Sequence, residues 1–377
     1  MSRSSNRDDF FQTTSSLEEV RRKAEKAGNN NGNPIKLQSK LLAITADPSS
    51  KSCVYVAESA GVLRKLVLET GETVATYRGP TAPLTSICFS VDGATVFAGC
   101  WDKTIWSWDV ASRKLKRQYK GHTDFVKVVI YANIGHDDLL ISGSADSEVI
   151  VWNISDGNRL HVFKDHSRGI QDLSLDPMSL DIEPSHITIF SAGSDRSIHQ
   201  FHFPQSPDGQ SNPEPILEHE TSVYKLFFDA DGDLWTASAD KSAKCLSRER
   251  KWNTEMTLEH PDFVRDILVH EARGWVVTAC RDEEVRVWNR ATGELYHTYS
   301  GHFEEVTGLL LLHNTIVSIS IDSTVRQWSL DPTKLQLAKA EAEAEAEGVE
   351  QEKEVDHGQE PLLTEEEERE LAELMED

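Results

Sequence analysis

The sequence predicts an all-β protein whose repeated units form a closed ring of seven small sheets. Six Asp residues each stand six positions before a large apolar residue; the pairs are Asp102–Trp108, Asp146–Trp152, Asp195–Phe201, Asp240–Leu246, Asp282–Trp288 and Asp322–Trp328. Successive Asp residues are 40 to 49 positions apart, and a His stands 20 to 29 residues before five of them (His122, His166, His219, His260 and His302). This period and order are typical of β-propeller blades.

Each unit also shows the pattern of short strands around its Asp. A short apolar run ending in small residues precedes the Asp, as in "LLISGSAD", and an alternating run such as "SEVIVW" follows it. These runs indicate two strands joined by a tight turn that holds the Asp. Six residues of extended chain span about 20 Å, so the Trp lies at the far end of the strand that follows the turn.

These residues resemble the WD-repeat family, which is named for a Trp-Asp pair that closes the third strand of a blade. One literal pair stands at Trp108-Asp109, and the resemblance covers residues 41–330. It implies a buried tetrad of His, Ser or Thr, Asp and Trp within a blade. Three units carry all four members: His122, Ser142, Asp146 and Trp152; His260, Thr278, Asp282 and Trp288; His302, Ser318, Asp322 and Trp328.

The tetrads predict a structural role rather than catalysis or metal binding. The sets recur once per blade, so they cannot converge on one substrate. A net hydrogen bond is worth about 1 kcal/mol, whereas an orphaned buried partner costs about 1 to 3 kcal/mol. Units that depart from the pattern, at Ala98, Phe201 and Leu246, should depend more on apolar packing.

Seven units of about 41 residues are needed to fill residues 41–330. The first has Ala60 and Leu66 at the Asp and Trp positions, and the last ends at Leu330 after its third strand. The missing strand is expected from "PIKLQ" at Pro34–Gln38, which would close the ring and give one domain over residues 34–330. Two irregular, Pro-rich segments lengthen the fourth unit at 176–186 and 203–215.

Extensions are expected on both sides of the ring. Residues 1–33 should be disordered except for a short helix at 16–28, which is either a marginal solvated helix or a docking helix for a partner or the ring's side. Residues 331–377 form an acidic tail with a helix expected at 364–376, either a solubilising segment or a partner-binding one.

Composition limits the classes of function. Net charge is −24, and the last 47 residues hold 18 acidic against 4 basic side chains. This charge disfavours nucleic acid and anionic membranes, although one basic stretch stands at 112–120. Five widely spaced Cys residues without CxxC spacing argue against zinc and fit a reducing compartment. We expect no cofactor, metal or small-molecule substrate, and a cytoplasmic or nuclear location.

The family resemblance implies that partners bind the face formed by the segment after each His and the turn before each Asp. The candidate partner-binding residues there are Trp101, Asp124, Phe125, Arg168, Phe263, Arg281, Phe303 and Ile321. Large aromatic and Arg side chains are typical of binding hot spots. Phe125 and Phe263 could equally plug the top of the core. Trp101 and Arg281 are the stronger candidates, because the blade pattern requires neither.

We expect a non-catalytic scaffold or adaptor that presents this face to protein partners in a larger complex. In one alternative, the acidic tail helix also binds a partner. An RNA-associated subunit of an RNA-processing or RNA-modifying complex is a second interpretation, supported only by the basic residues. A ubiquitin-ligase substrate receptor is a third, weakened by Ala111 where such adaptors often carry Arg. A propeller enzyme is disfavoured, because no nucleophile–base pair, phosphate loop or metal cluster is recognisable.

Overall fold

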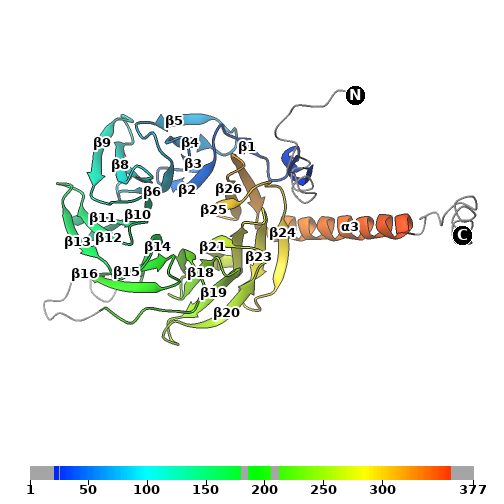
Figure 1. The fold of residues 1–377 in the computed structure, drawn as a ribbon. Helices are drawn as coiled ribbons and strands as arrows, with labels where there is room; N and C mark the ends of the chain where they lie inside the picture. Colours follow the sequence, from blue (N-terminus) through cyan, green and yellow to red (C-terminus); the bar gives the residue numbers. More distant parts are fainter. Residues whose placement is uncertain (1–20, 25, 180–185, 205–211, 358–377) are drawn as a thin grey trace, which may run out of the picture. The chain divides into compact units, whose positions relative to one another are not determined.

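The computed structural model describes residues 21–24, 26–179, 186–204 and 212–357. The chain divides into two units, Met1–Leu330 and Asp331–Asp377, which we treat separately. Within the first unit the described strands form seven antiparallel sheets arranged as the blades of a propeller (Figure 1). The expectation of an all-β, seven-bladed ring is confirmed.

The strands follow the chain from the channel outward in blades one to six, and in blade seven the outermost strand comes from the N-terminus. Blade one is β2 (Leu41–Asp47), β3 (Ser50–Glu58), β4 (Leu63–Val67) and β5 (Thr73–Tyr77); blade two is β6 (Leu84–Phe89), β7 (Thr95–Cys100), β8 (Thr104–Asp109) and β9 (Leu115–Lys120); blade three is β10 (Val126–Ile134), β11 (Asp137–Ser144), β12 (Val149–Asn153) and β13 (Arg159–Phe163). Blade four is β14 (Ile170–Leu175), β15 (Ile187–Gly193) and β16 (Ile198–Phe203); blade five is β17 (Val223–Phe228), β18 (Leu234–Ser238), β19 (Ser242–Ser247) and β20 (Asn253–Glu259). Blade six is β21 (Val264–His270), β22 (Trp275–Cys280), β23 (Val285–Asn289) and β24 (Leu295–Tyr299), and blade seven is β25 (Val306–Leu312), β26 (Thr315–Ser320), β27 (Thr324–Ser329) and β1 (Ile35–Lys36).

The core lies between neighbouring blades. Each innermost strand contacts the innermost strand of the next blade, and β25 of the last blade contacts β2 of the first. The second strand of each blade is covered on both faces, as in β7, where all six residues are buried. Strands buried on both faces are apolar along their length instead of alternating. This explains the continuous apolar run before each Asp.

The repeated Asp holds the turn between the second and third strands. In all six units the residue after the Asp has a positive φ, from 67° to 80°, although none of these residues is Gly. A carboxylate oxygen of each Asp accepts a hydrogen bond from the backbone N–H two residues later, as in Thr104 to Asp102 (2.9 Å) and Thr324 to Asp322 (2.8 Å). Such a side-chain bond stabilises a turn that most residues adopt reluctantly. The first unit lacks the Asp and has Gly61 at the strained position, with φ +74°.

The N-terminal strand closes the ring. Ile35 and Lys36 of β1 pair antiparallel with Val325 and Thr324 of β27, and the Leu37 N–H donates to the carbonyl of Ser323 (2.8 Å). Ile35 and Leu37 also pack against the apolar cluster between blades seven and one. The expected closing strand is therefore confirmed.

Blade four differs from the others. Among the described residues it has three strands, and Ile216 adds one isolated bridge to Ile198 at the outer edge of β16. Parts of the two irregular segments, residues 180–185 and 205–211, lie outside the described residues.

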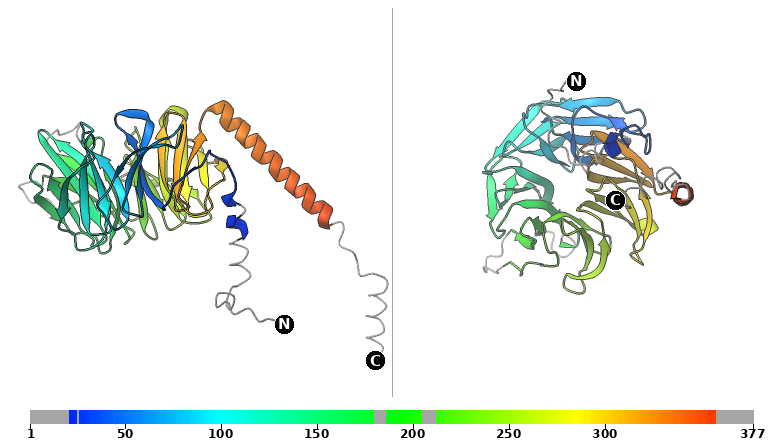
Figure 2. Two further views of the ribbon diagram at one scale, coloured as in Figure 1. Left: turned by 90° about the horizontal axis from the view of Figure 1, so that it is seen from above. Right: turned by 45° about the vertical axis from the view of Figure 1, so that its right-hand side comes forward.

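Part of the expected disordered N-terminus is ordered against the ring. Residues 21–24 and 26–27 are helical, and the amide of Asn29 donates to the carbonyl of Gly301 (2.9 Å). Figure 2 (left) shows this dark blue segment at one face of the edge-on ring. The proposed capping box of the 16–28 helix, Ser16 and Glu19, lies outside the described residues.

The second unit contains one long helix, α3 (Pro332–His357). The helix expected from the sequence at 364–376 lies outside the described residues. A carboxylate oxygen of Asp331 accepts hydrogen bonds from the N–H groups of Thr333 (3.1 Å) and Lys334 (3.4 Å), so Asp331 caps the helix and Pro332 occupies its first turn. In the described part of the chain, no helix is long and apolar enough to cross a membrane.

We expect Leu37→Pro to lower the free energy of unfolding by about 1 to 3 kcal/mol, because it removes a ladder donor and apolar packing at the ring closure. Lys36→Pro is the matched control, because the Lys36 N–H, unlike that of Leu37, points away from β27. Thermal unfolding monitored by circular dichroism would compare the two. Equal melting temperatures for both variants and the wild type would contradict a stabilising role for β1.

Candidate functional site

The loops expected from the sequence to form a binding platform share one face of the ring. In blades two to seven, the residue before the repeated Asp donates its N–H to a carbonyl in the segment that enters the innermost strand. The pairs are Trp101 to Pro83, Ala145 to Phe125, Ser194 to Gly169, Ala239 to Ser222, Arg281 to Phe263 and Ile321 to Glu305. These bonds bring the two sets of loops together, and we call this side of the ring the loop face.

An exposed aromatic pair joins blades two and three on the loop face. The rings of Trp101 and Phe125 are stacked, with centroids 5.1 Å apart and an interplanar angle of 17°. Their exposed fractions are 37% and 38%. The Lys127 ammonium lies 5.6 Å from the centre of the Trp101 ring, within reach of a cation–π interaction. Phe125 therefore contributes to the surface and does not plug the core.

A second group lies on blade six. The Arg281 guanidinium is 5.1 Å from the centre of the Phe263 ring and 4.0 Å from the Asp262 carboxylate. About half of the Arg281 side chain is exposed. Phe263 is half-buried beneath it. The guanidinium thus retains surface for an additional partner.

The remaining expected platform residues are spread around the face. Arg168 is exposed, whereas Asp124, Phe303 and Ile321 are half-buried. The Asp124 carboxylate accepts a hydrogen bond from the Phe125 N–H (2.8 Å), and the Phe303 N–H donates to Asp322 (3.2 Å). These two residues therefore also shape the loops.

The central channel contains side chains that the sequence analysis missed. A cavity of about 320 Å³ is lined by the innermost strands, including the fifth residue after each His: Lys127, Gln171, Tyr224, Arg265 and Thr307. The Arg265 guanidinium lies 4.2 Å from the centre of the Tyr224 ring and its Nε is 2.6 Å from Glu305. The constant offset from His is a sequence signal that could have identified this set.

Two buried carboxylates in the channel connect neighbouring blades. Asp172 of β14 accepts a hydrogen bond from the Leu226 N–H of β17 (2.9 Å), and Asp266 of β21 accepts one from the Leu309 N–H of β25 (2.7 Å). Burial raises the pKa of both carboxyls. Lys225 lies 3.4 Å from Asp172, whose charge raises the pKa of the lysine. The bonds to backbone amides assign these carboxylates a role in blade packing.

Two blades contain the complete four-residue network. In blade three, His122 Nδ1 lies 3.0 Å from Asp146, and His122 Nε2 lies 2.8 Å from Ser142 Oγ, which also accepts from Trp152 Nε1 (2.8 Å). Blade seven repeats this with His302, Ser318, Asp322 and Trp328. Burial opposes ionisation of Asp146, but its bonds to His122 and to backbone amides outweigh burial and lower its pKa to about 2.

Blade six departs from the expected tetrad. His260 Nδ1 bonds the carbonyl of Leu258 (3.0 Å) rather than Asp282, although His260 Nε2 and Trp288 Nε1 both reach Thr278 Oγ1. Asp282 instead accepts two hydrogen bonds from Arg286, at 3.1 and 2.5 Å. A guanidinium matches a carboxylate bidentately and outcompetes a neutral imidazole. The expectation that Asp282 completes this tetrad is therefore wrong.

Blades four and five keep more of the network than the sequence analysis expected. His166 bonds Ser191 Oγ (2.7 Å) and Asp195 (3.1 Å), and His219 likewise bonds Thr236 and Asp240. The apolar residues Phe201 and Leu246 replace only the Trp member. These blades combine a three-residue network with apolar packing.

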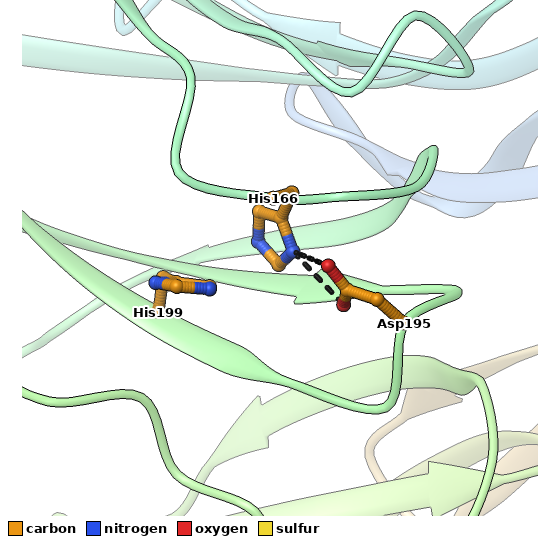
Figure 3. A group of neighbouring side chains, drawn as sticks. All are labelled: His166, Asp195 and His199. Atoms are coloured by element: carbon orange, nitrogen blue, oxygen red, sulfur yellow. Dashed lines mark hydrogen bonds and ion pairs between the residues drawn. The ribbon is translucent and has the colours of Figure 1, made fainter.

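His199 joins His166 and Asp195 in a group whose possible ligand atoms lie within 4.8 Å of one another (Figure 3). Both ring nitrogens of His166 already make hydrogen bonds, to Asp195 and Ser191. The His199 ring packs edge-on against the His166 ring, with centroids 4.3 Å apart, and is stacked with Phe201. A metal ion would have to displace the His166–Asp195 bond, so we assign the group to the network of blade four.

The basic stretch at 112–120 includes the outer strand β9. Lys116 donates to Thr95 Oγ1 (2.9 Å), and Arg117 donates to the carbonyl of Ser155 (3.3 Å). Two of its cations therefore form contacts within the ring.

Comparisons with known proteins agree with this architecture. The family model for the WD domain, G-beta repeat, matches residues 71–109, 113–153 and 252–289. An uncharacterized WD repeat-containing protein of Schizosaccharomyces pombe is 36% identical over 338 residues, covering 85% of this chain and 88% of that protein. Cell division control protein 4 of Saccharomyces cerevisiae is 27% identical and striatin of Mus musculus 26% identical, over 65% and 69% of this chain. The matches span 28% and 30% of those two proteins.

Double-mutant cycles would test the altered network of blade six. Alanine substitutions of Asp282 and Arg286 should couple by about 1 to 3 kcal/mol in urea unfolding, because each side chain is the other's charged partner. The cycle of Asp282 with His260 should give a smaller coupling energy. The Asp322–His302 cycle in blade seven is the positive control. A larger coupling of Asp282 to His260 than to Arg286 would contradict the assigned contacts.

The pH dependence of stability should reveal His260. Burial, with a smaller contribution from Arg286, lowers its pKa to about 4 in the folded protein despite the bond to Leu258. The unfolded state therefore binds more protons between about pH 6.5 and pH 4, and stability should fall as pH falls through this range. The loss attributable to His260 is roughly 3 kcal/mol. His260→Gln should reduce the slope of unfolding free energy against pH; parallel curves for variant and wild type would contradict the assignment.

Proposed function

Because the chain belongs to the WD-repeat family, we propose that it is a non-catalytic scaffold or adaptor that binds one or more protein partners on its loop face. The observation that carries this proposal is the stacked pair of Trp101 and Phe125. Two large aromatic side chains, each more than a third exposed, lie on loops of neighbouring blades. The repeat pattern requires neither ring at the surface.

The pair is suited to binding because it is already ordered. Stacking fixes both rings before a partner arrives, so little side-chain entropy remains to be lost on association. Trp, Tyr and Arg are enriched among residues whose truncation costs most at interfaces. Arg281 supplies such a guanidinium on the same face, and Lys127 and Arg265 line the channel cavity.

These features favour a protein partner over RNA. The basic stretch at 112–120 lies partly on an outer strand and uses Lys116 and Arg117 for contacts within the ring. The aromatic pair, in contrast, has the size and chemistry of a peptide- or protein-binding anchor. We place this activity in the cytoplasm or nucleus, consistent with five free cysteines.

The double substitution Trp101→Ala and Arg281→Ala should weaken partner binding strongly while leaving the fold intact. A loss of about 2 kcal/mol or more corresponds to a roughly 30-fold weaker dissociation constant. Affinity purification with quantitative mass spectrometry would compare wild type and variant. Melting temperatures should agree closely, because both side chains are exposed.

The matched control is Leu115→Ala with Arg250→Ala, which removes an exposed apolar side chain and an exposed guanidinium away from the loop face. This control should retain the wild-type partners. Unchanged partner recovery by the Trp101 and Arg281 variant would reject the loop face as the binding platform.

A further inference from the structure

Three carboxylates stand together on the loop face at blades six and seven. Glu283 and Glu284 follow Asp282 in the turn between β22 and β23, and Glu304 lies in the segment that leads into β25. We call them the acidic patch. The Glu283 side chain is only 4% exposed and Glu284 15%. Such a covered carboxylate requires a compensating cation.

The compensating cations come from the chain's own N-terminal segment. Arg22 lies 2.7 Å from Glu283, Lys26 lies 2.9 Å from both Glu283 and Glu284, and Lys23 lies 3.1 Å from Glu304. Residues 21–24 and 26–27 thus present three cations to three carboxylates of the ring. We call these residues the basic arm.

The attachment of the following residues is of another kind. The Arg326 guanidinium, which is completely buried, donates to Asn29 Oδ1 (2.7 Å) and to the carbonyl of Asn31. The Asn29 and Asn31 amides donate to the carbonyls of Gly301 and Ser300. If residues 29–31 separated from the ring, the buried Arg326 guanidinium would lose these hydrogen-bond partners. Residues 29–31 also lead directly into β1. This anchor is therefore part of the ring.

The basic arm contains no fully buried cation of this kind. Its three cations, Arg22, Lys23 and Lys26, remain 22% to 51% exposed, whereas their partner Glu283 is 4% exposed with the arm in place. Ion pairs at a surface are individually weak and are screened by salt. Gly28, which is exposed, lies between the arm and the anchor.

We propose that the acidic patch is a docking site for a basic helical segment, that the basic arm occupies it in cis, and that a partner bearing such a helix binds by displacing the arm. This proposal rests on the proposed scaffold function for its partner, but not for the cis contact. The anchor at Asn29 keeps the arm at a high local concentration beside the patch, so the arm competes with any segment that binds in trans. Arg281 is next to the acidic patch in sequence and would adjoin the partner helix after the arm is displaced.

The cis contact can be tested in the full chain by hydrogen–deuterium exchange. Glu283→Gln combined with Glu304→Gln should accelerate exchange of the amides of residues 21–24, 26 and 27 about tenfold, because three of the four ion pairs to the ring are lost and only Lys26–Glu284 remains. Exchange at residues 29–36 and the melting temperature should change little. Glu220→Gln, an exposed carboxylate directly after His219 on the same face, is the matched control. Equal arm exchange in the double variant and the wild type would overturn the proposal.

The acceptor role of the patch can be tested with a labelled peptide of residues 17–28 added in trans. A full-length variant with Arg22→Glu, Lys23→Glu and Lys26→Glu should bind this peptide at least about tenfold more tightly than the wild type in fluorescence anisotropy at low salt. Raising salt, or adding Glu283→Gln and Glu304→Gln to this variant, should weaken that binding. Equal affinities of wild type and arm variant, or no binding by either, would overturn the proposal. Neither experiment needs a cellular partner, so each can fail independently of the Trp101 and Arg281 test.

Discussion

The pairing of β1 with β27 is the contact on which the rest of the structure depends. Each sheet of the ring covers the faces of its neighbours, so the outer faces of blades one and seven are buried only when both ends of the array meet. The closing strand is short, but Ile35 and Leu37 also fill the cluster between blades seven and one. Anchoring by Arg326 just ahead of this strand holds the segment in register. Closure therefore combines a ladder, apolar packing and a buried guanidinium clamp.

Much of this fold was predictable because the physical requirement repeats. A strand buried on both faces needs a continuous apolar run, and a tight turn after it needs an acceptor for a free N–H. The two requirements together produce an apolar run followed by Asp at a regular period. Blade one could still be placed without the Asp, since its strand pattern remains and Gly61 occupies the strained turn.

The site was less predictable, because it depends on which of several neighbouring side chains binds the same partner group. Arg286 and Arg326 both stand four residues after a repeated Asp. Arg286 takes its Asp away from His260, whereas Arg326 turns to Asn29 and Asn31 and leaves Asp322 to His302. Spacing alone cannot distinguish these outcomes. The Trp101–Phe125 stack likewise joins residues from separate units, and only the ring's geometry brings them together.

The Asp-anchored turns allow the loop face to vary in sequence. In every one of these turns the residue after the Asp adopts the same left-handed backbone conformation; these residues are Lys103, Ser147, Arg196, Lys241, Glu283 and Ser323. The carboxylate, not the identity of that residue, secures the loop. The protein thus has six equivalent turn positions around one rim, five of them exposed or half-buried and Glu283 buried, whose charge and size differ while the backbone conformation stays constant. Selection could therefore redesign the recognition chemistry of this rim one residue at a time without endangering the architecture.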